Sequence, residues 1–140
     1  MTKSQRAELY AMFDGHCAYC GQELPPTGWH ADHIEPVMRD GKWVKVDNHP
    51  RGWSHVMKQT GVLLRPENQR KDNYFPACRA CNIDKSCMPL EDWRKSLEDR
   101  PRVCRDNHSA FRHAERFGLV AVIETKVTFY FERIRAEVAA

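Results

Sequence analysis

Four of the six cysteines stand in two Cys-x2-Cys pairs, Cys17/Cys20 and Cys78/Cys81. The two-residue gap lets both sulfurs of a pair turn toward one ion, and four thiolates at about 2.3 Å complete a tetrahedral zinc site. Such a site has no open coordination position, so we expect it to stabilise the fold rather than to react. The sequence therefore predicts a structural Zn²⁺ that joins two distant segments.

Two other readings of the cysteines stay open at this point. The pairs can be free thiols, or one of them can be a redox-active dithiol of the thioredoxin type. A disulfide scaffold is disfavoured, because such scaffolds are shorter secreted chains with a higher density of cysteines. Cys87 and Cys104 have no partner at a ligand spacing, and we expect them to be ordinary thiols.

A second group of residues has the types needed for phosphodiester hydrolysis. Asp32 and Asn82 offer oxygen ligands that suit Mg²⁺ or Mn²⁺. His33 titrates near neutral pH, so its imidazole can accept a proton from an attacking water. Neighbouring residues on a regular strand face opposite sides, so Asp32 and His33 serve one phosphate only if the strand ends close to them.

Short elements must hold these residues in the first half of the chain. The pattern predicts a helix over residues 3–13, with Thr2 and Gln5 in a capping box. It predicts a strand over residues 28–34, which carries Asp32 and ends before Pro36. A short strand is expected over residues 43–46, an irregular segment over 66–77, and the start of a helix near Asn82.

The second half of the chain is predicted to be mainly helical. Pro89 suits the first turn of a helix that Pro101 ends, and a further helix is expected over residues 109–117. Apolar residues over 119–123 and 127–134 predict a β-hairpin. The fold class is therefore α+β, in a single domain over residues 1–140 with a motif core over 17–94 and a helix-and-hairpin extension over 101–140.

The composition indicates a soluble protein rather than a membrane protein. The longest apolar run without a charge, residues 117–123, is seven residues, whereas a membrane-spanning helix needs about 20. The first residues lack the apolar stretch of a secretory signal, so we expect a cytoplasmic protein.

Charge is unevenly distributed along the chain. The total is only +3, but residues 39–85 carry ten lysines and arginines against five acidic residues. Basic side chains bind backbone phosphates without reading bases, which makes this region the candidate nucleic-acid interface. Trp43 and Trp53 lie among these charges; we expect them to anchor a long loop to the core, the alternative being that they stack on bases.

Three segments together resemble the zinc-stapled type of HNH endonuclease. They are Cys17-Ala-Tyr-Cys20-Gly21, Ala31-Asp32-His33-Ile34-Glu-Pro36 and Asp72-Asn73-x4-Cys78-x2-Cys81-Asn82-x2-Lys85. Residues 65–94 are similar to small HNH proteins encoded by phages and prophages. The third motif position, often histidine in the family, is Asn82 here, which resembles the variant found in the phage endonuclease VII type.

The resemblance implies a fold, an activity and a set of roles. The fold would be a ββα-metal (His-Me finger) core in which Asp32 and Asn82 hold one catalytic Mg²⁺ or Mn²⁺ ion. His33 would activate the water that leaves a 5′-phosphate, and Asn73 would support the loop that orients His33. The substrate would be DNA, double-stranded or branched, in a bacterial host cell. Backbone contacts are expected from four nearby basic residues, Arg70, Lys71, Arg79 and Lys85.

Two functions of other classes remain as alternatives. A noncatalytic, zinc-stabilised nucleic-acid-binding module would explain the cysteines and the basic region, but not Asp32, His33 and Asn82 together. A thiol oxidoreductase would bind no stoichiometric metal.

Overall fold

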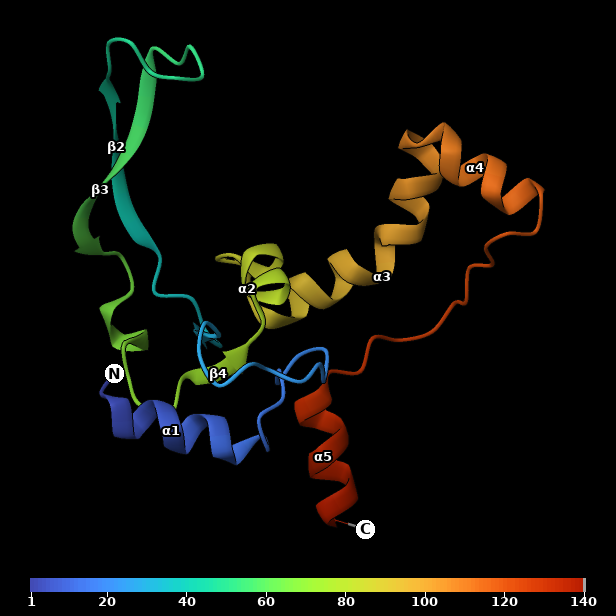
Figure 1. Cartoon of the computed structure of the whole chain (residues 1–140), viewed down its shortest axis with the longest axis horizontal. Helices are drawn as coiled ribbons and strands as arrows, with labels where there is room; N and C mark the ends of the chain where they lie inside the picture. The colour runs from blue at the N-terminus through green and yellow to red at the C-terminus, as the bar shows by residue number, and fades with distance from the viewer. Residues whose placement is uncertain (140) are drawn as a thin grey trace.

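A computed structural model describes residues 1–139, which form an α+β protein with two separate two-stranded sheets (Figure 1). In chain order the elements are α1 (Lys3–Met12), β1 (His30–His33), β2 (Arg39–Lys45), β3 (His55–Leu63), the 3₁₀ turn η1 (Pro66–Asn68), β4 (Tyr74–Ala77), α2 (Arg79–Lys85), α3 (Leu90–Asn107), α4 (Ser109–Arg116) and α5 (Tyr130–Ala139). Within residues 1–139, no helix combines the length and the low polarity needed to cross a membrane.

The first sheet pairs two strands that are far apart in sequence. β1 and β4 run antiparallel, with Asp32 opposite Phe75 and His33 opposite Tyr74, and α2 begins directly after β4. The predicted strand that carries Asp32 is confirmed. The irregular segment predicted over 66–77 is wrong for β4, because a two-stranded sheet has only edge strands and so accommodates Pro76.

The N-terminal helix is confirmed nearly in full. Thr2 and Gln5 form both hydrogen bonds of the predicted capping box, which satisfies backbone N–H groups that the first turn leaves free. Leu9 and Phe13 from this helix are buried, and Phe13 packs edge-on against Phe75 of β4. α1 therefore covers the small sheet.

Aromatic side chains from the chain's two halves make the rest of the core. Tyr19 packs edge-on against Trp93 of α3 at a centroid distance of 5.0 Å, and Trp93 stacks on Phe129 at 5.2 Å. Phe131 of α5 lies against Phe75 at 4.8 Å. The core thus joins the first sheet, α3 and the C-terminal segment.

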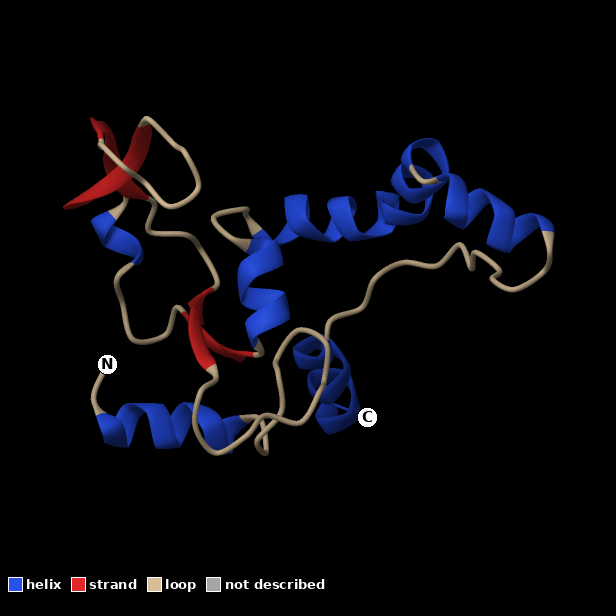
Figure 2. Cartoon of the chain, turned by 45° about the horizontal axis from the view of Figure 1, so that its top comes forward, coloured by secondary structure: helices blue, strands red, loops and turns tan. Residues whose placement is uncertain are grey.

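The second sheet, β2 with β3, projects from the body as a hairpin, which we call the arm (residues 39–63; Figures 1 and 2). The strand expected over 43–46 is present and longer than predicted, beginning at Arg39. The expectation that Trp43 and Trp53 anchor this segment to the core is wrong, since their exposed fractions are 69% and 51%.

α3 continues past Pro101, where the sequence predicts its end. A proline inside a helix removes one backbone hydrogen bond, but side chains on either side support this helix. Arg102 binds Asp99 and Asp106 across successive turns, at 2.5 and 3.0 Å. The helix then ends at Asn107 and α4 follows, close to the predicted bounds of 109–117.

The predicted C-terminal β-hairpin is wrong: residues 118–129 form no strand and α5 begins at Tyr130. The alternation of Val127, Phe129 and Phe131 favours a strand, yet the two phenylalanines become buried on either side of a helix start. The Glu132 carboxylate accepts a hydrogen bond from the Phe129 N–H at 2.9 Å, which caps the helix.

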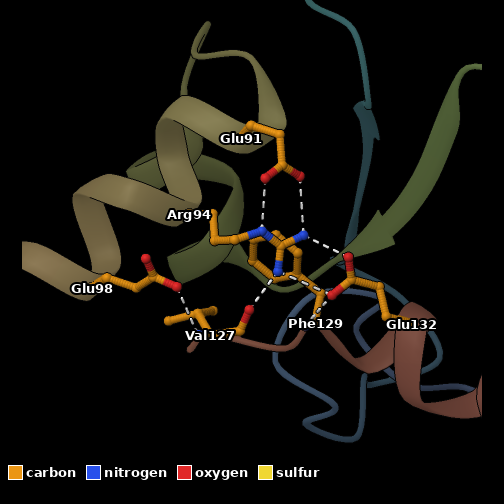
Figure 3. A network of polar contacts seen from close by, with 6 residues as sticks. All are labelled: Glu91, Arg94, Glu98, Val127, Phe129 and Glu132. Atoms are coloured by element: carbon orange, nitrogen blue, oxygen red, sulfur yellow. Dashed lines mark hydrogen bonds and ion pairs between the residues drawn. The ribbon is translucent and has the colours of Figure 1, made fainter. Parts of the chain in front are cut away.

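Arg94 of α3 holds the segment that precedes α5 (Figure 3). Its guanidinium donates to both Glu132 carboxylate oxygens, at 2.5 and 3.0 Å, and to the Val127 carbonyl. It also lies 4.4 Å from the centre of the Phe129 ring and pairs with the exposed Glu91. These contacts, above all the hydrogen bond from Arg94, lower the pKa of Glu132, as expected for a fork-shaped ion pair.

We expect Arg94→Met to lower the free energy of unfolding by about 2 kcal/mol, because it leaves the half-buried Glu132 carboxylate and the Val127 carbonyl without their partner. The matched variant Glu91→Gln removes only an exposed pair and should cost less than about 0.5 kcal/mol. Urea denaturation of the zinc-loaded protein measures both. Equal effects of the two variants would contradict the role given to Arg94.

Candidate functional site

The four cysteines of the two pairs meet at one point, as predicted. Their sulfurs all lie within 4.8 Å of one another, and Cys20 and Cys78 are 3.9 Å apart. Tetrahedral zinc with Zn–S bonds of 2.3 Å places neighbouring sulfurs about 3.8 Å apart. The cluster therefore fits a structural metal ion such as Zn²⁺, whereas a dithiol redox site needs only one pair.

Local backbone structure positions each of the two cysteine pairs in this cluster. Cys78 is the N-cap of α2, and its sulfur accepts a hydrogen bond from the Cys81 N–H at 3.4 Å. The other pair lies in a turn that closes from the Gly21 N–H to the Cys17 carbonyl at 2.9 Å. Gly21 has a φ of +77°, and a Cβ there would lie 3.0 Å from the Tyr130 ring, so both backbone and packing favour glycine.

The thiols influence one another strongly. A hydrogen bond from the Cys81 thiol lowers the pKa of Cys17 to about 4, and the same bond raises the pKa of Cys81. Burial raises the pKa of Cys20. Thiolates this close repel one another, so a cation at the centre is needed before all four ionise.

The cluster also anchors the C-terminal helix. The Tyr130 and Phe131 N–H groups at the start of α5 donate to the carbonyls of Tyr19 and Ala18, at 2.9 and 2.8 Å. The Ala18 N–H in turn donates to the Pro76 carbonyl of β4 at 2.8 Å. The cysteine turn therefore connects β4 to α5, and its geometry affects both ends of the chain.

An open cleft of about 690 Å³ lies beside β1 and α2. Asp32, His33 and Asn82 all border it, so residues that are 50 positions apart share one surface. β1 ends at His33, which agrees with the requirement that the strand stop near these two residues. Three of the four residues predicted to serve catalysis therefore meet at this cleft, and Asn73 does not border it.

Asp32 is buried and already partly neutralised. Its Oδ2 accepts a hydrogen bond from the Tyr19 hydroxyl at 2.6 Å and pairs with the Lys85 ammonium at 3.1 Å. Burial, and then the Asp32 charge, raise the pKa of Tyr19, so the tyrosine stays a donor. Within residues 1–139, the other carboxylate oxygen, Oδ1, has no hydrogen-bonded or ion-paired partner. Every fully buried side-chain oxygen in this part of the chain does have a hydrogen-bonded partner, so Oδ1 is in contact with solvent.

The prediction that Lys85 contacts DNA phosphates is wrong, because its side chain is completely buried. Its ammonium donates to the His33 carbonyl at 2.7 Å and pairs with Asp32. The three-residue spacing does place Asn82 and Lys85 on one face of α2, but that face packs on β1. Lys85 is therefore a positioning residue for the end of β1.

We expect Lys85→Met to lower the free energy of unfolding by about 3 kcal/mol, because it leaves a buried carboxylate without its counter-ion. Adding Asp32→Asn should restore part of that loss, since the uncompensated charge is then gone. A double-mutant cycle by urea denaturation measures the coupling. Additive losses would show that the pair is not coupled.

His33 is half-buried and oriented by Gln69. Its Nε2 lies 3.0 Å from Gln69 Oε1, while Gln69 Nε2 donates to the Tyr74 hydroxyl at 2.9 Å. In this orientation of the Gln69 amide its oxygen accepts from the Nε2–H of His33, and the lone pair of the imidazole is on Nδ1. Burial lowers the pKa of His33, which favours the neutral imidazole that a general base requires.

The Asn73 side chain holds the loop after β1, the position that the resemblance gives it. Its amide accepts from the Glu35 N–H at 2.9 Å and donates to the carbonyls of Glu35 and Asn68, both at 2.8 Å. With all these bonds made, the Asn73 side chain is almost completely buried.

In contrast, the Asn82 amide has no hydrogen-bonded partner within residues 1–139 and borders the cleft.

The other expected DNA contacts do not gather at the cleft. Arg70 and Lys71 border a different hollow beside α1, and Arg70 pairs with Asp72 at 3.1 Å. Arg79 is exposed on α2 without bordering the cleft. The cations that do border it are Arg6 and Arg39. No pattern in the sequence indicates Arg6, which lies on α1, 24 residues before the start of β1. Arg39, in contrast, belongs to the basic region over residues 39–85.

No protein-family model matches the chain, and neither a curated protein nor a solved structure shows significant similarity to it.

Proposed function

We propose that the chain is a metal-dependent DNA endonuclease of the HNH type, hydrolysing phosphodiester bonds. The observation that carries the proposal is the cleft that His33, Asp32 and Asn82 border together, where burial lowers the pKa of His33 and the Asn82 amide has no hydrogen-bonded partner within residues 1–139. A base, hard oxygen ligands and open space are the parts that phosphodiester hydrolysis needs.

The order of elements supports the same proposal. β1, β4 and α2 form an antiparallel strand pair followed by a helix, which is the arrangement expected of a ββα-metal core. The cysteine cluster lies at the junction between β4 and α2, where a Zn²⁺ ion would fix the helix against the sheet. The arm is then an insertion between the two strands of this core.

The donor atoms in the cleft fit a hard divalent cation. Asp32 Oδ1 and the Asn82 amide oxygen are ligands that Mg²⁺ and Mn²⁺ prefer, and the remaining positions would belong to water and substrate. When bound, the ion supplies charge stabilisation for the departing 3′ oxygen.

The chain's own residues supply the proton transfer. His33 Nδ1 takes a proton from water, and the resulting hydroxide attacks the phosphorus. The bond from phosphorus to the 3′ oxygen breaks, leaving a 5′-phosphate and a 3′-hydroxyl that is protonated from solvent. Gln69 holds the imidazole and Asn73 holds the following loop, so the base needs little rearrangement.

Incubation of zinc-loaded protein with supercoiled plasmid tests the proposal. We expect nicked or linear products with added Mg²⁺ or Mn²⁺, none without an added ion, and 5′-phosphate ends on mapping. Plasmid that stays intact with both ions, over a range of salt concentrations, contradicts the proposal.

A noncatalytic nucleic-acid-binding module is the second candidate, and the Lys85–Asp32 pair favours it. The lysine already neutralises the carboxylate that would hold the ion, which lowers its attraction for a cation. This candidate predicts binding of DNA with no cleavage at any Mg²⁺ or Mn²⁺ concentration, so the same plasmid assay, with a binding measurement beside it, separates the two.

A further inference from the structure

The arm is fixed only at its base. The Leu64 and Arg65 N–H groups donate to the Met38 and Val37 carbonyls, at 2.8 and 2.9 Å, and beyond this point the two strands project from the body (Figures 1 and 2). An isolated two-stranded hairpin is only marginally stable in water, and its faces normally need a covering layer. The arm therefore presents two faces that the rest of residues 1–139 leaves open.

One face of the arm carries an exposed apolar pair, with Lys45 and His55 two residues further along the same face. Trp43 lies directly opposite Met57, so both side chains are on the same face, and their exposed fractions are 69% and 51%. Among residues 1–139, Trp43 has no aromatic or cation–π partner, whereas Trp53 near the tip stacks on His49 at 4.7 Å. We take this adjoining exposed pair as the candidate contact surface of the arm.

The other face carries the half-buried pair Val44 and Val56 and, next to it, two like charges opposite each other. Lys42 lies directly opposite Lys58, a cross-strand pair that destabilises the hairpin when nothing negative is near. The arm as a whole carries five lysines and arginines against two aspartates. None of these five cations forms an ion pair with a carboxylate of residues 1–139. The charge pattern therefore fits a polyanion.

The arm rises directly from the candidate active site. Arg39 and Gln59 at its base border the same cleft as Asp32, His33 and Asn82. A polymer with one phosphate in the cleft would therefore continue along the arm. The seven residues of β2 give the arm a length of about 23 Å.

We propose that the arm is a duplex-DNA-binding ribbon that enters the major groove next to the cleft, an inference that rests on DNA being the substrate of the proposed function. The major groove is about 12 Å wide and admits a two-stranded β-ribbon. The Trp43 and Met57 face contacts the base edges. Lys42 and Lys58, one on each strand, reach the phosphates on the two walls of the groove. Bound duplex DNA thus covers the exposed apolar pair and neutralises the repulsion between the opposed lysines.

Fluorescence anisotropy with a short labelled duplex tests this, using the zinc-loaded full chain without added Mg²⁺ or Mn²⁺. For the double variant Lys42→Ala/Lys58→Ala we expect weaker binding and a plot of log K against log salt that is shallower by about 2, since each phosphate contact contributes about 0.9. Trp43→Ala should weaken binding about tenfold and leave the salt slope unchanged. In the wild type, duplex should also protect Trp43 from acrylamide quenching.

The matched control is Lys95→Ala/Lys126→Ala, which removes two exposed lysines from α3 and from the segment before α5. It should leave affinity and slope unchanged, and thermal unfolding should show all variants folded. In this binding assay the proposal would be overturned by an unchanged slope in the arm variant or an equal loss in the control. Tighter binding of single-stranded DNA or RNA than of duplex, or self-association through Trp43 instead of DNA binding, would overturn it as well.

The cleavage assay separates this proposal from the proposed function. Arm-dependent binding of duplex without cleavage in Mg²⁺ or Mn²⁺ would leave the arm proposal standing and contradict the endonuclease. Cleavage of short duplex at an unchanged rate and affinity in the arm variants would contradict the arm proposal alone. A wild-type protein that binds no duplex overturns the arm proposal whatever the cleavage result.

Discussion

His33→Ala should cleave plasmid DNA about 10²–10⁴-fold more slowly than the wild type, the range that a positioned general base contributes. The reason lies in the tautomer: Gln69 Oε1 accepts a hydrogen bond from the Nε2–H of His33, which leaves Nδ1 as the acceptor on a residue that borders the cleft. Alanine removes that acceptor and keeps the His33 backbone carbonyl, to which the ammonium of the Asp32–Lys85 pair donates. Initial rates on supercoiled plasmid, at a saturating Mg²⁺ or Mn²⁺ concentration, measure the loss.

Two comparisons make this result specific. His113→Ala removes an exposed histidine on α4, and its cleavage rate should match the wild type. DNA affinity of His33→Ala, measured without added Mg²⁺ or Mn²⁺, should also match the wild type, because the missing group acts on water rather than on the polymer. Cleavage by His33→Ala at the wild-type rate would show that another residue is the base, or that a contaminant cuts.

Asn82 gives an independent readout of the same site. If its amide oxygen is a metal ligand, Asn82→Ala should need a higher Mg²⁺ concentration for half-maximal cleavage, and Asn82→Asp should recover activity at low Mg²⁺ because a carboxylate binds the ion more strongly. A residue that only supports the helix would change stability instead of the metal dependence.

Local signals in the sequence predict the parts of this site that depend on short-range chemistry. The capping box marks the start of α1, and the Cys-x2-Cys spacing finds the cluster that joins residues 17–20 to 78–81. The strand carrying Asp32 is also found. These predictions succeed because each depends on neighbours within a few residues, where backbone geometry limits the possibilities.

The errors arise where tertiary packing decides between two locally acceptable outcomes. Val127, Phe129 and Phe131 alternate like a strand, but Phe129 and Phe131 find their place in the aromatic core, and the Arg94–Glu132 pair stabilises a helix start instead. Lys85 is spaced to share a face with Asn82, and only the packing of α2 on β1 decides that Lys85 is buried while Asn82 borders the cleft. Trp43 shows the converse, a large apolar residue that no core covers.

Removing zinc should unfold the protein, and this is the larger of the two effects. A structural zinc contributes about 10–16 kcal/mol at neutral pH, whereas the whole free energy of unfolding of a domain is about 5–15 kcal/mol. The cysteine turn also carries the backbone hydrogen bonds that join β4 to α5, so its loss releases both. We expect one Zn²⁺ per chain by elemental analysis, and loss of cooperative thermal unfolding after chelation.

Single substitutions locate the effect at the cluster. Cys17→Ser and Cys78→Ser each remove one ligand from a different pair, so both should lose the zinc and unfold. Cys87→Ser, an exposed thiol outside the cluster, should keep the ion and unfold at the wild-type temperature. Because chelation leaves every cysteine in place, a protein that stays folded without zinc would show that the aromatic core alone holds α5 and β4 together. The four thiols would then be available for redox chemistry, which is what the thiol oxidoreductase alternative requires.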